Sequence, residues 1–193
     1  MKNADAIVVG ANGSIYAAPV GSAVPADVSA ALDPEWVDLG YVTEDGVSWT
    51  DGKSIQSVRA WQSFYDIRRI IESREGSLGF GLMEWKGGNV QLAFGGGEVT
   101  ETALDSGLYE YTPPDPANID ERALAVEWQD GAKNYRLICL KGMVSDNVET
   151  NIVRTGASVL PITFAFLGQD GVAVFRFQTD DPAFADVSEV AAP

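Results

Sequence analysis

Three acidic residues stand directly before a tryptophan in the sequence. The pairs are Glu35-Trp36, Glu84-Trp85 and Glu127-Trp128. Sugar-binding sites often place an aromatic ring beside a carboxylate, and glycoside hydrolysis uses two carboxyl groups at a fixed separation. A half-buried strand with alternating faces also produces such neighbours, and tryptophans in β-proteins commonly anchor cores and interfaces. The pairs therefore keep a carbohydrate-binding or hydrolytic β-domain open as an alternative without establishing it.

The sequence contains no histidine and a single cysteine, Cys139. Without histidine, neither Ser-His nor Cys-His activation of a nucleophile is possible, and no imidazole can bind a metal. Cys139 lies in an apolar run at 135–140, where we expect a buried, unreactive thiol. The chain also lacks the phosphate-loop, dinucleotide-binding, nucleophile-elbow and calcium-loop motifs. We therefore expect no catalytic site, no cofactor and no metal.

The charge of the chain excludes two further classes of partner. Its 193 residues include 28 acidic and 13 basic side chains, a net charge of −15. This balance argues against a nucleic-acid interface made of clustered Lys and Arg, and against docking on anionic lipid. No apolar run approaches the roughly 20 residues of a membrane span. The apolar patch at 6–9 is too short for a secretory signal, so we expect synthesis in the cytoplasm and no membrane partner.

The first 35 residues are rich in Ala, Gly, Pro and Ser. Prolines at positions 19, 25 and 34 break any long helix, so we expect an extended N-terminal arm with one short strand at 14–17. Such a segment has little to pack on within its own chain, and it should be disordered or lie along a neighbouring molecule. A β-domain at 36–179 and a loose tail at 180–193 are expected to follow.

Strands and turns dominate from residue 37 onward. Asp45-Gly46 and Asp51-Gly52 are typical of tight turns and flank a short strand at 47–50. A further strand is expected at 55–61.

A long hairpin is expected at residues 64–84. Its arms are predicted at 65–73 and 78–84, with a turn near Glu75-Gly76. In the first arm the side chains alternate between a mostly apolar face and a mostly charged one.

Residues 86–94 predict a short helix. Val90, Ala93 and Phe94 fall at i, i+3 and i+4 and would form its packing face. Three glycines at 95–97 end it. A helix of about two and a half turns must be held in place by packing.

The second half of the chain repeats the strand pattern. An alternating strand at 122–129 turns at Asp130-Gly131 into a strand at 133–140, and a last hairpin is expected at 157–178 around residues 169–171. Counting gives eight to ten strands and one or two short helices. The fold class is therefore mainly β, a β-sandwich or barrel.

Four segments occur in a recognisable order: GSIYAAP at 13–19, WVDLGYVTEDGV at 36–47, AWQ at 60–62 and LMEW at 82–85, just before the short helix. This order resembles the tail tube (major tail) proteins of long-tailed bacteriophages, especially those infecting actinobacteria. The resemblance covers most of residues 10–180. Each segment alone is weakly specific, and the likeness rests on their order, the helix position and the chain length.

That resemblance implies a β-sandwich with one flanking helix, six copies of which close into a ring with a β-barrel inner wall. Stacked rings would form the hollow tail tube, a conduit for DNA ejection. It thus implies a structural virion protein, not an enzyme, assembled in the host cytoplasm. The implied partners are further copies, the tape-measure protein, the tail terminator, baseplate or tail-tip proteins, and double-stranded DNA that passes without specific binding.

Two sets of residues are candidates for this assembly. Arms and free sheet edges can reach neighbouring subunits or rings. The candidates are Ile15, Tyr16 and Pro19 in the arm, and Asp45 and Trp49 in an expected loop at 43–53. A negative bore would let DNA pass without holding it. The candidate lumen-facing residues are Asp66, Arg68, Glu72 and Glu127. A head-decoration or tail-end protein of a virion is a further alternative to the tube.

Overall fold

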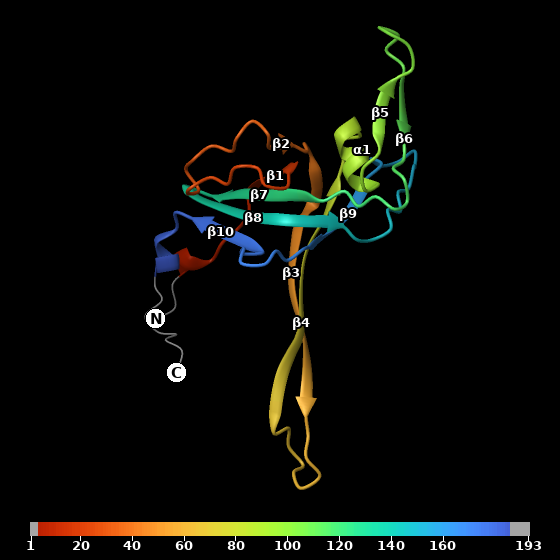
Figure 1. The fold of residues 1–193 in the computed structure, drawn as a ribbon. Coiled ribbons are helices and arrows are strands. Elements are labelled where there is room, and N and C mark those ends of the chain that lie inside the picture. Colours follow the sequence, from red (N-terminus) through yellow and green to blue (C-terminus); the bar gives the residue numbers. More distant parts are fainter. Residues whose placement is uncertain (1–3, 186–193) are drawn as a thin grey trace.

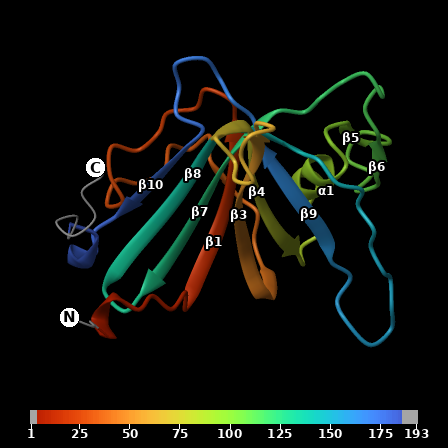
Figure 2. The same ribbon diagram turned by 90° about the horizontal axis from the view of Figure 1, so that it is seen from below.

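The computed structural model describes residues 4–185, which form a mainly antiparallel β-structure with one α-helix (Figures 1 and 2). In chain order the elements are η1 Ala4–Ala6, β1 Asn12–Pro19, β2 Val37–Asp38, β3 Val42–Val58, β4 Arg68–Leu82, α1 Gly87–Ala93, β5 Glu98–Glu101, β6 Tyr109–Thr112, β7 Arg122–Asp130, β8 Lys133–Val144, β9 Leu160–Phe166, β10 Phe175–Thr179 and η2 Pro182–Ala185.

The main sheet runs in the order β2-β1-β7-β8-β9-β4-β3, and β10 also pairs with β8. One edge of β8 has two neighbours, since residues 135–139 pair with β10 and residues 142–144 pair with β9. The sheet therefore divides along β8 into two parts (Figure 2), and the main core cluster takes buried side chains from both of them. The mainly β fold with one short flanking helix is confirmed, and its two-part sheet is consistent with a sandwich.

The core is made by alternating side chains of both parts of the sheet. Ile15, Leu124 and Leu137 come from β1, β7 and β8, while Leu78 and Phe164 come from β4 and β9. All five are almost completely buried. Alternation along a strand places such residues on one face, so each part of the sheet contributes one apolar face to the core.

The opposite face of β1, β7 and β8 is also covered. Ala123, Ala125 and Ile138 are buried there under Trp36. Trp36 donates a hydrogen bond from Nε1 to the carbonyl oxygen of Ala23 at 3.0 Å. The segment between β1 and β2 therefore lies on this face, and the small alanine side chains let it approach closely.

The expectation that the first 35 residues have little to pack on in their own chain is wrong. β1 pairs with β7 over its full length, far beyond the short strand expected at 14–17. Arg136, which is buried, donates to the carbonyl oxygens of Asp27 and Ala30 at 2.7 and 2.9 Å. These contacts hold the segment after β1 on the sheet. The domain boundaries at 35 and 179 stay predictions.

β3 and β4 form one long hairpin, and the turns expected within them are wrong. Asp51 pairs with Gly76 and Gly52 pairs with Glu75 across the two strands, so neither dipeptide is a turn. The chain reverses at residues 59–67 instead. Cross-strand pairing and packing have overridden the local Asp-Gly preference here.

Asp45-Gly46 lies in β3, where it forms an irregularity and not a tight turn. The register shifts between Val42 and Val47, and Gly46 has a φ of 68°. Five steps along β3 from Val42 to Val47 face two steps along β4 from Leu82 to Phe80, so β3 carries three extra residues here. Such an insertion is a β-bulge, and glycine suits its positive φ. The expected loop at 43–53 is therefore bulged strand.

The far half of this hairpin leaves the body of the protein (Figure 1). β9 pairs with β4 only at residues 77–82, so residues 68–76 have β3 as their strand partner. At about 3.3 Å per residue this two-stranded ribbon extends roughly 30 Å past β9. We call residues 51–76 the hairpin arm.

The last hairpin expected in the sequence is wrong in its pairing. β9 pairs with β4 and β8, and β10 pairs with β8. A single bridge, Gln169 to Val172, joins the loop between them. A second hairpin that the pattern did not predict, β5 with β6, projects beside α1 on the side of the body away from the arm (Figure 1).

Residues 180–185 are fixed to the body, so a loose tail is wrong for this part. The Asp180 carboxylate accepts hydrogen bonds from the backbone N–H and Nδ2 of Asn134, both at 2.7 Å. The buried Asp181 carboxylate accepts from the Tyr135 hydroxyl at 2.7 Å and from Lys133 Nζ at 3.0 Å. The rest of the expected tail, 186–193, lies outside the described residues.

Candidate assembly surfaces

The acid–tryptophan pair Glu84-Trp85 connects the end of β4 to two distant segments, at Tyr41 and at Ser158. Glu84 accepts hydrogen bonds from Lys86 Nζ at 2.6 Å and from the Tyr41 backbone N–H at 2.8 Å. These two bonds, the Lys86 one foremost, lower the pKa of the Glu84 carboxyl. Trp85 donates from Nε1 to the Ser158 carbonyl oxygen at 2.9 Å. The carboxylate is thus held as a structural anion.

The other two pairs are also engaged within the chain. Glu127 forms an ion pair with Arg136, whose side chain is buried, and Trp128 stacks on Tyr135 with ring centroids 5.5 Å apart. Trp36 is buried beneath the N-terminal segment. All three tryptophans thus serve the fold of their own chain, and Glu84 and Glu127 are held in ion pairs.

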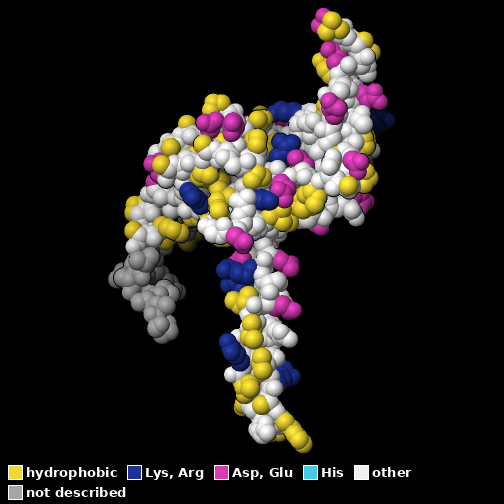
Figure 3. Space-filling model, in the orientation of Figure 1, with side chains coloured by type: hydrophobic (Ala, Val, Ile, Leu, Met, Phe, Trp, Pro, Cys, Tyr) yellow, Lys and Arg dark blue, Asp and Glu magenta, His cyan; other side chains and the backbone are white. Residues whose placement is uncertain are grey.

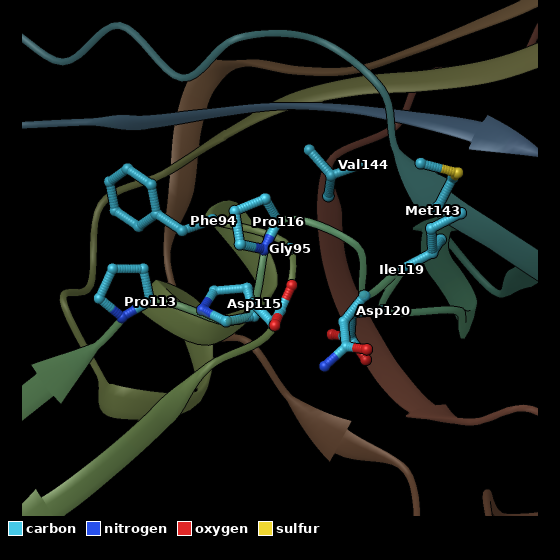
Figure 4. Close-up of a pocket in the computed structure, with 11 residues that line it drawn as sticks. Phe94, Gly95, Pro113, Asp115, Pro116, Ile119, Asp120, Met143 and Val144 are labelled. Atoms are coloured by element: carbon cyan, nitrogen blue, oxygen red, sulfur yellow. The ribbon is translucent and has the colours of Figure 1, made fainter.

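A pocket of about 430 Å³ lies between the residues after α1, the proline-rich loop at 113–116 and the end of β8 (Figure 4). Both of its carboxylates serve the local fold. Asp115 accepts from the Ala117 backbone N–H at 2.9 Å, and Asp120 forms an ion pair with Arg122 at 2.9 Å. Within residues 4–185, no group of three or more metal-ligating side chains is assembled.

Cys139 is completely buried in the core, as expected. Burial raises the pKa of its thiol to about 12. The thiolate is the reactive form of cysteine, so this side chain is inert in the folded protein.

Three of the four candidate lumen residues lie together on the hairpin arm. Asp66 accepts hydrogen bonds from Ser57 Oγ at 2.7 Å, Arg59 Nε at 2.9 Å and Arg69 Nε at 3.2 Å. These bonds, led by the one from Ser57, lower the pKa of the Asp66 carboxyl to about 2. Asp66 therefore links the two strands of the arm at the point where the turn at 59–67 begins and ends. Arg68 and Glu72 are exposed on β4 close by.

Glu127 is separated from this group, because it lies on β7 and pairs with the buried Arg136. Its carboxylate is committed to the contact that anchors the N-terminal segment. Whether any of the four residues faces a bore stays a prediction.

The candidate interface residues have different surroundings. Ile15 is buried in the core, so its side chain is not available to another subunit and that expectation is wrong. Tyr16 is half-buried against the cluster around Trp36 on the outer face of β1, β7 and β8, and Pro19 is exposed. Asp45 is exposed at the bulge of β3.

Trp49 lies on β3, not in a loop, and it connects the two parts of the sheet. Its ring meets Phe175 edge-on at 5.2 Å and stacks on Phe177 at 6.4 Å between centroids. About two fifths of the residue is still exposed. Trp49 is therefore chiefly a packing residue at the root of the arm.

The buried face of α1 consists of Asn89, Leu92 and Ala93. The expected face of Val90, Ala93 and Phe94 is wrong for Phe94, because the helix ends at Ala93 and Phe94 turns outward to contact Tyr111 at 5.9 Å. Asn89 Nδ2 donates to the carbonyl oxygens of Leu39 and Glu84, both at 2.8 Å. A polar residue that ties α1 to two loops was not expected from the apolar pattern.

The arm carries a series of exposed apolar side chains, of which the sequence analysis noted only the mostly apolar face of the strand expected at 65–73. They are Ile55, Val58, Trp61, Phe64, Tyr65, Ile67, Ile70 and Ile71. Trp61 is 100% exposed. The available signal was their density, since large apolar residues recur throughout 55–71. A contiguous exposed apolar surface marks an interaction site.

The arm also differs in charge from the rest of the molecule (Figure 3). Residues 51–76 contain five basic and four acidic side chains, a net charge of +1. The remaining residues hold eight basic and 24 acidic side chains, a net charge of −16. An almost neutral, apolar projection thus leaves a strongly acidic body.

β3 is an edge strand along its whole 17 residues. Its outer edge pairs with no other strand of the described chain, and at the other end of the sheet β2 covers only two residues of β1. Long unpaired edges favour pairing with another chain. The arm and these edges are the features expected of a subunit that assembles with further copies.

Comparison with known proteins gives the same indication. Residues 1–189 match the model of a family described as phage tail tube protein. The search of curated proteins returned no match. Among the described residues, no helix is long and apolar enough to span a membrane. A match over nearly the entire chain, on a β-fold with a projecting arm and free edges, shows that this protein belongs to the phage tail tube protein family.

Proposed function

We propose that six copies of this chain close into a ring, and that rings stack into a tail tube whose bore conducts DNA during ejection. Membership of the family makes the chain a structural protein of the phage tail. The ring of six, the stacking and the passage of DNA are the steps added here.

The hairpin arm is the observation that carries this proposal. An isolated two-stranded ribbon is marginally stable in water, yet this one extends roughly 30 Å past β9. Its apolar side chains contribute little to the core of their own chain, since residues such as Ile55 and Ile71 are more than half exposed. A neighbouring subunit that covers them would stabilise both the arm and the assembly.

The edges of the sheet support closure of a ring. The free edge of β3 and the sparsely covered edge of β1 lie at opposite ends of the strand order. A contact between two different edges is heterologous, and repeated rotation by a fixed angle closes it into a ring. Such pairing would continue the sheet from one subunit to the next.

Net charge suits a conduit for DNA. A ring of six chains carries six times −15, or −90, formal charges. A negative wall repels the duplex over about 8 Å at physiological salt, whereas exposed basic side chains would retain it. The arm carries only +1, so Asp66, Arg68 and Glu72 contribute little net field and the body must supply a negative bore. A strongly positive bore in the assembled tube would contradict this part.

The remaining partners follow from the same proposal. The bore would hold the tape-measure protein during assembly, and the tail terminator and the baseplate or tail-tip proteins would contact the two ends. Assembly would take place in the host cytoplasm. The lack of a histidine in the sequence and the engaged carboxylates in the structure support a role without catalysis.

Negative-stain electron microscopy of the purified protein, beside size-exclusion chromatography, tests the proposal. We expect hollow filaments of uniform width, or rings that stack as the concentration rises. Rings that never stack would instead support a tail-end protein. A monomer that stays monomeric at high concentration, even after addition of a tail-tip complex, would contradict the tube.

A further inference from the structure

The turn of the arm presents aromatic side chains in a fixed arrangement. Trp61, Phe64 and Tyr65 are each more than four fifths exposed. The backbone between them is hydrogen-bonded, with Ser63 N–H donating to the Ala60 carbonyl oxygen at 3.1 Å and Ile67 N–H donating across the turn at 3.0 Å. A turn that is already ordered before it binds loses less conformational entropy on binding. The tip of the arm is therefore preorganised for contact with a partner.

The ion pairs beneath the tip add to this order. Arg59 and Arg69 both bind Asp66 although their own side chains are about three quarters exposed. Residues 59–69 together carry three arginines and one aspartate, a net charge of +2. The tip of the arm, residues 59–69, therefore combines exposed aromatic side chains with a positive charge. Such a surface suits an apolar pocket surrounded by acidic residues.

A pocket of this kind lies on the far side of the same molecule. A cavity of about 440 Å³ between α1 and the β5–β6 hairpin is lined mainly by Trp85, Val90, Val99, Tyr109 and Tyr111. The Tyr111 hydroxyl is fixed by donation to the Gly96 carbonyl oxygen at 3.0 Å. Exposed aromatic walls favour offset or edge-to-face contact with another aromatic ring.

The surroundings of that pocket are acidic. Residues 97–121, which include both strands of the β5–β6 hairpin, contain seven acidic side chains and no lysine or arginine. One of them, Glu110, is among the residues that line the pocket. Charges of opposite sign on two surfaces steer their encounter and select the partner. The basic tip and the acidic pocket are therefore complementary in charge, and both are rich in aromatic side chains.

The two surfaces lie at opposite ends of the molecule (Figures 1 and 3). The arm points away from the body on one side, and α1 with β5 and β6 stands on the other. A tip and a pocket so placed cannot meet within one chain, but they meet head to tail when copies are stacked. The occupant whose shape and charge fit the pocket is therefore a second copy of this chain.

We infer that Trp61 and Phe64 of one subunit insert into the pocket between α1 and β5–β6 of a subunit in the next ring, with Arg68 near Glu110. This rests on the proposed stacking of rings and adds to it the pair of surfaces that join them. The contact fixes the direction of stacking, because the tip and its pocket are different surfaces.

Disulfide trapping in the assembled protein tests the pairing. The double variant Gln62→Cys/Tyr109→Cys keeps both inserted aromatic side chains, because Gln62 is the exposed neighbour of Trp61. Oxidised as filaments, it should give a ladder of covalent multimers on non-reducing gels. Cys139 is buried and should stay silent. Matched controls are both single variants and two double variants, Gln62→Cys/Ile152→Cys and Gln62→Cys/Ile119→Cys. Ile152 is exposed on another loop, and Ile119 lines the proline-rich pocket.

The outcomes separate this inference from the proposed function. A ladder from the Tyr109 pair alone supports the inference. Filaments that give no ladder with Tyr109, or an equal ladder with Ile119 or Ile152, would overturn the inference and leave the tube intact. A wild-type chain that forms no filament would remove both.

A charge reversal gives an independent test. Arg68 lies outside the ion pairs around Asp66, so Arg68→Glu should leave the tip ordered. Arg68→Glu and Glu110→Arg should each raise the critical concentration for filament formation, by about tenfold, because like charges then face each other. The double variant should return it to near the wild-type value. A double variant as impaired as the worse single one would contradict the pairing.

Discussion

The two halves of the β3–β4 hairpin both carry large apolar side chains but lie in different environments. In the half next to the body, Leu78 and Leu82 of β4 are completely buried between the two parts of the sheet. In the arm, Ile70 and Ile71 of the same strand are about half exposed. The difference lies in what covers them, since β9 pairs with β4 at residues 77–82 and the described chain provides no second neighbour for residues 68–76.

This contrast shows that apolar content along a strand does not distinguish a core from an interface. The inner half of the hairpin stabilises the subunit, whereas in the proposed assembly the outer half is stabilised by a second molecule that covers it. Substitutions in the two halves should therefore separate folding from assembly, and the following predictions use matched pairs of residues for that purpose.

The largest difference is expected between Leu78→Ala and Ile71→Ala, both on β4. Leu78→Ala leaves a cavity in the core and should lower the free energy of unfolding by about 2–5 kcal/mol. Ile71→Ala at an exposed position should change it by less than about 0.5 kcal/mol. Urea unfolding of unassembled protein, followed by tryptophan fluorescence, measures both. Equal losses would show that the arm is part of the folding core.

A smaller difference is expected between two tryptophans on the hairpin. Trp49→Ala removes ring contacts with Phe175 and Phe177, and it should cost about 1–2 kcal/mol of stability. Trp61→Ala at the tip should leave the stability of the subunit unchanged and should reduce filament formation. The unfolding curve and sedimentation of the same samples report the two effects. A destabilised Trp61 variant would contradict the division of roles.

The sequence predicted the fold class and many of the strands, because alternation of apolar and polar residues within one strand indicates which face of that strand is buried. The strand expected at 122–129 is β7, and the expected helix is α1 within a residue at each end. Phe94 was misassigned because periodicity continues past the point at which the glycines stop the helix. Asn89 was missed because its hydrogen bonds reach loops that are distant in the sequence.

The hairpin could not be predicted from local pattern, because its length depends on pairing between strands. Gly76 looked like a turn residue, yet a side chain there would meet the Phe166 ring at 2.4 Å. The glycine thus allows β4 to pack closely against Phe166 at the end of β9. The covered outer face had a signal, since Ala123 and Ala125 alternate with core residues on β7 and both are buried.

The smallest expected effect concerns pH. Hydrogen bonds from the Ala183 backbone N–H and the Tyr135 hydroxyl, with Lys133 nearby, lower the pKa of the Asp181 carboxyl from 3.8. A lowered pKa means that the folded state is stabilised above pH 3.8 and loses this contribution as pH falls through the folded pKa. The wild-type melting temperature should therefore drop in acid, and Asp181→Asn should melt lower at neutral pH with a weaker acid dependence.

Asp66→Asn is the matched control for this prediction. The pKa of Asp66 is also lowered, to about 2, yet this carboxyl braces the arm and not the body. Its substitution should leave the melting temperature of the unassembled subunit unchanged at any pH. An equal loss in both variants would mean that the arm and the body unfold as one unit.

Shortening the arm tests the central claim most directly. Lys53 and Arg74 are paired across the hairpin, so residues 54–73 can be replaced by Asn-Gly, which favours a two-residue hairpin turn. The shortened chain and the full chain are compared by electron microscopy and by thermal unfolding at matched concentrations. We expect the shortened chain to fold with nearly the same melting temperature and to form no stacked filaments. Filaments of the same width and abundance from the shortened chain would contradict the assignment of the arm to assembly.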